Sequence, residues 1–153
     1  MTFNLLRKPW IAVLRTDGSS GEVSLLDAFR DGESIQRVTG ELPTQAFAIH
    51  RLLLAILHRA APVRTPSEWA ELNHDRAGLV ADVDEYLRHF ENRFDLFHPS
   101  QPFFQVADLR TAKDDVGGLE RLIADVPNGH QFLTMRSGRG VARIGAAEAA
   151  RWL

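Results

Sequence analysis

The chain contains no cysteine, only two lysines and a single tyrosine among its 153 residues. The absence of cysteine excludes disulfide bonds, thiolate metal ligands and cysteine nucleophiles, and with them several classes of enzyme. No apolar run approaches the roughly 18 residues that a membrane span requires, and the first ten residues lack the long apolar region of a secretory signal. We therefore expect a cytoplasmic protein with no membrane segment.

Length and composition predict one ordinary globular domain. With 153 residues, of which 44% are hydrophobic and 25% charged, the chain is long enough to bury one core. Sixteen of its 18 basic residues are arginine. Arginine suits bidentate contacts with phosphate and stacking on flat rings, although high genomic GC content produces the same bias. The stretch 127–153 is locally basic, with four arginines against one acidic residue, Glu148.

The most unusual stretch is the aromatic segment, which we define as residues 93–106, RFDLFHPSQPFFQV. Its two prolines, Pro99 and Pro102, remove backbone donors and disfavour a regular helix or a central strand. Large apolar rings are costly to leave in water. We therefore expect an irregular clasp packed on the core through its four phenylalanines, with a platform for a ligand or nucleobase as the alternative. These are Phe94, Phe97, Phe103 and Phe104.

The remaining pattern predicts an α+β fold in which a small N-terminal antiparallel sheet packs on two long helices. We expect strands at 3–6, 10–15, 22–24 and 34–38, a short helix at 25–29, and long helices at 44–60 and 76–93. The first long helix is apolar on nearly every side, which predicts that it is central and mostly buried. Thr65, Pro66 and Glu68 predict a helix start with a capping box, followed by a buried Trp69. Beyond the aromatic segment we expect a loop at 107–118, a short helix at 119–125, a strand at 130–135 and a helix from 141.

Histidines are the only candidates for catalytic chemistry in this chain. His50 and His58 share one stripe of the first long helix, and His89 follows Glu85 by four residues. No metal motif such as HExxH is present, and neither is the GxSxG of serine hydrolases or a P-loop. The sequence therefore predicts no catalytic residue, no metal site and no cofactor. A small metal-dependent hydrolase that uses the face of His50, His58 and His89 is the competing hypothesis.

Residues 126–140 have the composition of a phosphate contact. They offer unhindered backbone amides, small polar side chains, the arginines Arg136 and Arg139, and Phe132 as a ring on which a base could stack. These are components of a contact with RNA or another single strand. A hairpin with a solvated basic tip is equally consistent with the composition.

Four stretches occur in an order and spacing that resemble the CasA family, the large subunit of the type I-E CRISPR surveillance complex Cascade. They are NLLRKPWIAV from Asn4, GELPTQAFAIHRLLLAILHRA from Gly40, the aromatic segment, and LERLIADVPNGHQFLT from Leu119. Family proteins run to several hundred residues. The resemblance therefore implies that residues 1–153 are a truncated N-terminal domain, without the later helical bundle.

The resemblance also implies a function. Family members are non-catalytic subunits that hold the 5′ handle of the crRNA, recognise the short motif flanking the target double-stranded DNA, and help recruit a nuclease-helicase. The guide reads the target by base pairing, as in other RNA-guided effectors. The Phe-Val-Asn motif that contacts the guide in the family corresponds to Phe132, Leu133 and Thr134, with threonine in place of asparagine. We expect these residues, with Arg136 and Arg139, to bind nucleic acid. A pure protein-interaction domain is a third hypothesis.

Overall fold

Three short strands form an antiparallel sheet with β1 at its centre and β2 and β3 on either side. Their bounds are β1 Ile11–Arg15, β2 Ser20–Val23 and β3 Ile35–Val38. In the computed structural model, which describes residues 2–124, 126 and 142–153, Ile11 pairs with Val23 across the first hairpin. Gly18 lies in the hairpin turn with φ of 85°, a backbone conformation that glycine adopts without steric cost. The predicted N-terminal sheet is therefore confirmed.

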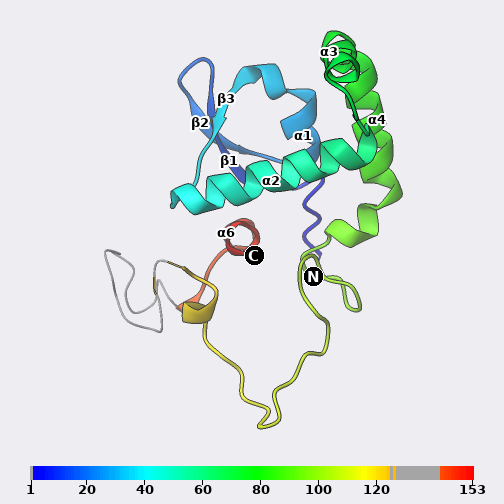
Figure 1. Ribbon diagram of the computed structural model, residues 1–153. Helices are drawn as coiled ribbons and strands as arrows, with labels where there is room; N and C mark the ends of the chain where they lie inside the picture. Colours follow the sequence, from blue (N-terminus) through cyan, green and yellow to red (C-terminus); the bar gives the residue numbers. More distant parts are fainter. Residues whose placement is uncertain (1, 125, 127–141) are drawn as a thin grey trace.

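Helices cover the sheet and extend beyond it, as Figure 1 shows: α2 runs across the sheet, α4 lies at one end of α2, and α6 lies beneath it. The α-helices are α1 Leu25–Arg30, α2 Pro43–Ala60, α3 Pro66–His74, α4 Arg76–His89 and α6 Ala146–Trp152. Short 3-10 helices are η1 Gly32–Ser34, η2 Glu91–Phe94 and η3 Leu119–Arg121. None of the helices in the described parts is long and apolar enough to cross a membrane. The predicted mixed fold with two long helices is confirmed.

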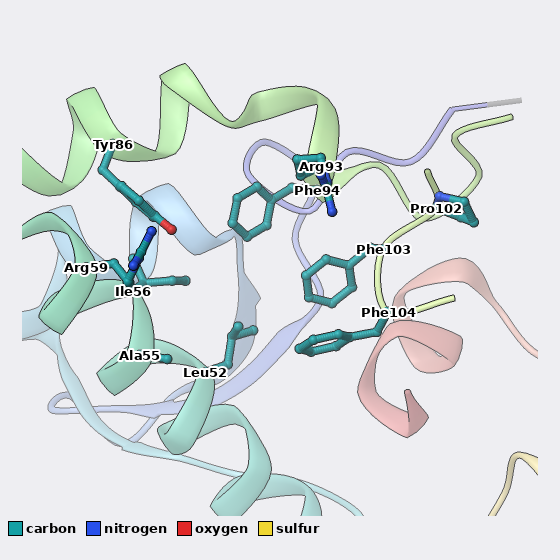
Figure 2. Close-up of a pocket in the computed structure, with 10 residues that line it drawn as sticks. All are labelled: Leu52, Ala55, Ile56, Arg59, Tyr86, Arg93, Phe94, Pro102, Phe103 and Phe104. Carbon is teal, nitrogen blue, oxygen red and sulfur yellow. The ribbon is translucent and has the colours of Figure 1, made fainter. Parts of the chain in front are cut away.

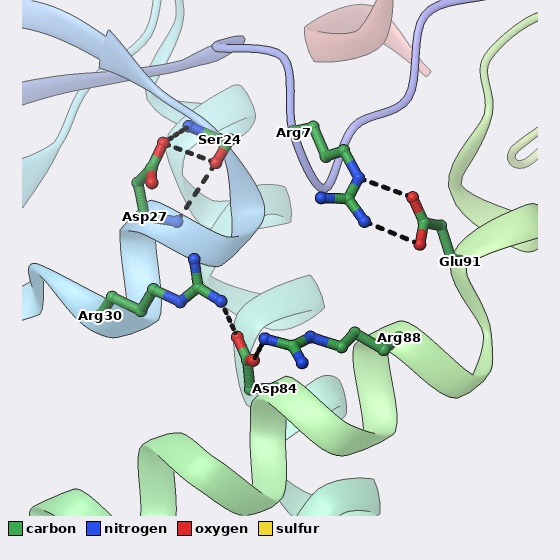
Figure 3. A network of polar contacts seen from close by, with 7 residues as sticks. All are labelled: Arg7, Ser24, Asp27, Arg30, Asp84, Arg88 and Glu91. Carbon is green, nitrogen blue, oxygen red and sulfur yellow. Dashed lines mark hydrogen bonds and ion pairs between the residues drawn. The ribbon is translucent and has the colours of Figure 1, made fainter.

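Local signals explain where several helices begin. Thr65 accepts a hydrogen bond from the Glu68 amide at 3.2 Å, and the Glu68 carboxylate accepts one from the Thr65 amide in return. This reciprocal capping satisfies amides at the first turn of α3 that have no partner within the helix. The same arrangement joins Ser24 and Asp27 at the start of α1 (Figure 3).

The N-terminal segment lies between α1 and the aromatic segment and is bonded to both. The Leu5 amide donates to the Phe94 carbonyl at 2.8 Å, and the Leu25 amide donates to the Leu5 carbonyl at 3.1 Å. Residues 3–6 do not form the predicted strand, because pairing is limited to a single bridge between Asn4 and Asp95. On the side away from Asp95, the neighbouring main chain is that of α1. Within α1, only the amides at the helix start donate hydrogen bonds to the N-terminal segment.

Ion pairs reinforce the same junction (Figure 3). Arg7 holds Glu91 through two contacts, Nε to Oε1 at 2.7 Å and Nη2 to Oε2 at 3.0 Å. These hydrogen bonds and the guanidinium charge lower the pKa of Glu91 and raise that of Arg7. Asp84 on α4 accepts from Arg30 of α1 and from Arg88 one turn further along α4. Charge pairing thus links α1 and the N-terminal segment to the α4 region.

The core lies between the sheet, the N-terminal segment and the inner faces of α1, α2, α4 and α6. Trp10 is its largest fully buried side chain, and its indole Nε1–H donates to the Leu5 carbonyl at 3.1 Å. The other buried members are mainly aliphatic, among them Leu6, Ile11, Val13, Leu25, Ile49, Ile56, Val83, Leu87, Leu96 and Ala150. Phe94 and Phe103 of the aromatic segment complete this core.

The prediction that α2 is mostly buried is wrong. Ile49 and Ile56 face the core, but Phe47 is 66% exposed and Leu54 is about half exposed. A helix that lies over one layer can bury only the stripe that faces it, whatever the composition of its outer side. Trp69 of α3, also predicted to be buried, is nearly half exposed. α3 packs mainly on α4 and leaves that ring facing water.

Two helix boundaries also differ from the prediction. The helix predicted over 76–93 ends at His89, and Phe90 is partly exposed at the boundary. The chain then tightens into η2, whose different periodicity directs Phe94 into the core. The helix predicted over 119–125 is the shorter η3. The strand predicted at 130–135 lies outside the described residues.

Candidate nucleic-acid interface

The residues predicted to contact nucleic acid all lie outside the described part of the chain. They are Phe132, Leu133, Thr134, Arg136 and Arg139. The described structure therefore bears on them only through the residues on either side. It also presents a second candidate interface, at the aromatic segment.

The described residues on either side of the 127–141 stretch include buried side chains. Before it, Ile123 and Val126 are buried. After it, α6 packs on α2 and places Ala150 in the core. The Arg151 guanidinium donates to the Trp10 carbonyl at 2.9 Å and to Glu22 at 2.5 Å. The side that follows the stretch is therefore held on the core by burial and by hydrogen bonds.

The aromatic segment divides its phenylalanines between the core and the surface. Phe94 and Phe103 are buried, with ring centroids 5.7 Å apart in a stacked arrangement. The Phe103 amide donates to the Asp95 carbonyl at 3.0 Å, which fixes the segment at that point. Phe97 and Phe104 are exposed, Phe104 to 71%. The prediction that all four rings are buried is therefore wrong for two of them.

Phe104 combines an exposed ring with an unusual backbone conformation. Its φ is 50°, in the left-handed region that residues other than glycine rarely adopt. The ring stays in contact with the buried Phe103 at a centroid distance of 4.5 Å.

An apolar pocket of about 260 Å³ opens between α2, α4, η2 and the aromatic segment (Figure 2). Ten residues line it: Leu52, Ala55, Ile56, Arg59, Tyr86, Arg93, Phe94, Pro102, Phe103 and Phe104. Figure 2 shows Phe94, Phe103 and Phe104 along one side, with Tyr86 and Arg59 close together at the far end and Arg93 at the opposite end. We call this hollow the aromatic pocket. None of its described lining residues carries a carboxylate.

A second, polar hollow of about 280 Å³ adjoins the aromatic pocket and shares Arg93 and Pro102 with it. Its other lining residues are Ser100, Gln101, Gln105, Val106 and Ala107. A third hollow shares Arg59 and Tyr86 with the pocket and includes the acidic Asp82 and Glu85. Neither Arg59 nor Arg93 forms an ion pair with a described residue. The pocket thus has a cationic side chain at each end.

The histidines of the competing hydrolase hypothesis are exposed and lack the geometry of a metal site. The Nδ1–H of His50 donates to the Ala46 carbonyl of its own helix at 2.7 Å. His58 lies two turns further along α2, and His89 sits at the end of α4 with its ring edge-on to Phe90. Over residues 2–124, 126 and 142–153, no three histidine or carboxylate side chains are grouped to hold a metal.

Comparison with known proteins adds what geometry alone does not. The family model for CRISPR-associated protein Cse1 matches residues 4–153. The chain belongs to the Cse1 family, also named CasA. CasA/Cse1 of Thermus thermophilus is 40% identical over 109 residues, which are 70% of this chain and 21% of that protein. The resemblance noted in the sequence is thus confirmed.

Solved structures agree with this assignment. The crystal structure of Thermobifida fusca Cse1 matches 99% of this chain with a TM-score of 0.87 at 50% identity, and 29% of that protein is covered. A chain of a CRISPR RNA-guided surveillance complex shares the fold, with a TM-score of 0.73 at 23% identity over 99% of this chain and 33% of its own. The matched part therefore covers between a fifth and a third of the length of each of these proteins.

Proposed function

We propose that this chain is the N-terminal region of a non-catalytic, nucleic-acid-binding subunit of a type I-E CRISPR surveillance complex. Membership of the Cse1 family across residues 4–153 is the observation that carries the proposal. A chain with this fold occurs in a CRISPR RNA-guided surveillance complex, which supports it. The partners would be the other Cascade subunits, the crRNA and the target DNA, in the cytoplasm and away from membranes.

Within this function, residues 132–134 would contact the 5′ handle of the crRNA and the two nearby arginines would lie along phosphates. The attachment of α6, which follows the 127–141 stretch, supports this assignment, because a contact loop needs a rigid scaffold to present it. Phe132 would stack on a base, Thr134 would offer one hydroxyl, and Arg136 and Arg139 would neutralise phosphate charge.

Recognition of the motif flanking the target, and recruitment of the nuclease-helicase, belong to the same proposal at the level of the whole protein. Family proteins are more than three times as long as this chain in the Thermobifida example, of which 29% is covered. We assign most residues that read the flanking motif to the part of the family protein beyond the matched region.

The test compares two kinds of substitution in a full-length family protein carrying residues 4–153. Phe132→Ala should weaken its incorporation into guide-loaded complex by about 1 to 3 kcal/mol, the range for one stacked base, with little dependence on salt. Arg136→Ala and Arg139→Ala should each lower the slope of log K against log salt by about 0.7 for every phosphate of the single strand that the variant no longer neutralises.

Two matched controls use exposed residues far along the chain from this stretch. Phe47→Ala removes an exposed ring from α2, and Arg37→Ala removes an exposed arginine from β3. Both should leave assembly and its salt dependence unchanged. Normal assembly by all three test variants, measured by native electrophoresis across a salt series, would overturn the assignment of this stretch. It would favour a domain that contacts only protein.

A further inference from the structure

The aromatic pocket combines surfaces that an ordinary gap in packing does not bring together. Its walls are apolar rings and aliphatic side chains, and each end carries a guanidinium that has no carboxylate partner among the described residues. One ring, Phe104, is held at the rim with a left-handed backbone and most of its surface in water. That conformation costs energy that a purely structural phenylalanine would avoid.

We propose that the aromatic pocket binds one unpaired nucleotide of a single-stranded nucleic acid. The base lies against the rings of Phe103 and Phe104, and the phosphate lies at Arg93. This inference rests on the proposed function for the class of ligand, and it adds a contact site built from residues other than 132–139. It uses only residues that the structure describes.

Charge assigns the two ends of the pocket to different parts of the nucleotide. Arg59 borders the hollow that contains Asp82 and Glu85, whose carboxylates would repel a phosphate. Arg93 instead borders the polar hollow, whose described lining contains no acidic residue. The phosphate therefore belongs at Arg93. Ser100 and Gln101 line the same polar hollow and offer further hydrogen-bond donors to the sugar-phosphate backbone of the nucleic acid.

The other end of the pocket suits the edge of a base. Arg59 supplies guanidinium donors and Tyr86 a hydroxyl that can donate or accept, and both residues line this pocket and the third hollow. Arginine donors pair readily with ring nitrogen and carbonyl acceptors of bases. The volume of about 260 Å³ is slightly below the roughly 300 Å³ at which pockets for larger ligands begin. It fits one base better than an extended ligand.

A polypeptide is the other occupant that an apolar pocket could take. An aliphatic anchor would use the walls, but it would make no use of the Tyr86 hydroxyl or of the two exposed guanidinium groups unless acidic side chains flanked it. A single nucleotide would stack its base on the rings, pair the edge of the base with the donors of Arg59 and Tyr86, and place its phosphate at the charge of Arg93. The observations therefore favour the nucleotide, and a polypeptide remains an outcome of the experiment.

The experiment measures binding of fluorescein-labelled oligonucleotides of about eight residues, a length within the range that one single-strand site spans, to the 153-residue chain by fluorescence anisotropy at low salt. Single-stranded DNA and RNA are compared with a duplex of the same sequence, whose paired bases cannot enter the pocket. Phe104→Ala should weaken single-strand binding about 5- to 150-fold, and Phe104→Trp should retain it because the larger ring still stacks. Arg93→Gln should lower the salt slope by about 0.7.

The controls are Phe47→Ala and Arg37→Gln, which remove an exposed ring and an exposed charge outside the pocket and should change nothing. Absence of single-strand binding, equal binding of the duplex, or unchanged binding by Phe104→Ala would each overturn the inference. So would Phe104-dependent binding of an acidic leucine-containing peptide by a chain that binds no oligonucleotide. If Phe104→Ala leaves oligonucleotide binding unchanged while Arg136→Ala and Arg139→Ala still alter incorporation into the guide-loaded complex, the pocket inference fails and the proposed function stands.

Discussion

Phe103 and Phe104 are adjacent, identical in chemistry and opposite in burial, so they test the packing of the aromatic segment directly. A phenylalanine can bury about 200 Å², and each Å² of apolar surface removed from water contributes about 25 cal/mol. Because Phe103 is 7% exposed, Phe103→Ala should lower the free energy of unfolding by about 4 kcal/mol, as expected for a buried phenylalanine. Phe104 is 71% exposed, and its replacement should cost about 1 kcal/mol.

Urea titration followed by tryptophan fluorescence measures this difference, since Trp10 lies in the core that the unfolding transition exposes. With a slope of about 2 kcal/mol per molar urea, Phe103→Ala should move the midpoint down by about 2 M and Phe104→Ala by less than about 0.5 M. Equal shifts for the two variants, or a larger shift for Phe104→Ala, would refute the division between core and surface rings.

Three further predictions concern charge, capping and chemistry. Since Arg7 lowers the pKa of Glu91, Glu91→Gln should lower the melting temperature at neutral pH. The difference from wild type should be full above the ordinary glutamate pKa of about 4.3, shrink as pH falls below it, and vanish only once pH is below the lowered pKa of Glu91 in the folded chain. Thr65→Ala should destabilise the fold by about 1 kcal/mol in urea titrations, while the neighbouring Ser67→Ala should be nearly neutral. The purified chain should cleave neither DNA nor RNA and hydrolyse no ATP with Mg²⁺, Mn²⁺ or Zn²⁺; activity that copurifies with it would support the hydrolase hypothesis.

Features set by neighbours in sequence were predictable. The capping box at Thr65 and Glu68 depends on residues three positions apart, and the structure confirms it. The hairpin needed a turn residue that tolerates positive φ, and Gly18 provides it. The family could also be recognised, because four stretches carried it in the correct order and the family model matches them together.

Features set by distant contacts were not predictable. Phe103 and Phe104 have the same propensities, and only the bond from the Phe103 amide to Asp95 and the left-handed backbone at Phe104 separate them. The same limit applies to α2, whose apolar outer residues Phe47 and Leu54 look like core in the sequence. Whether a helix face is buried depends on which elements pack against it, and the hydrophobic periodicity of the helix does not show which elements these are.

The aromatic pocket shows the same limit at the level of function. Leu52 comes from α2, Tyr86 from α4 and Phe103 from the aromatic segment, so no short motif contains the site. The composition of the aromatic segment indicated a platform only as an alternative to a structural clasp. The structure confirms the clasp for Phe94 and Phe103, which pack in the core, while Phe104 stays at the surface.

This division of rings makes stability and binding separable in the aromatic segment. The main chain is held by bonds from the Leu5 amide to the Phe94 carbonyl and from the Phe103 amide to the Asp95 carbonyl, and neither involves the side chain of Phe104. The buried rings anchor the segment to the N-terminal residues and to α4, so the anchor does not depend on what occupies the pocket. A substitution at Phe104 therefore alters the surface presented to a ligand and leaves its scaffold in place, as a binding site on an irregular segment requires.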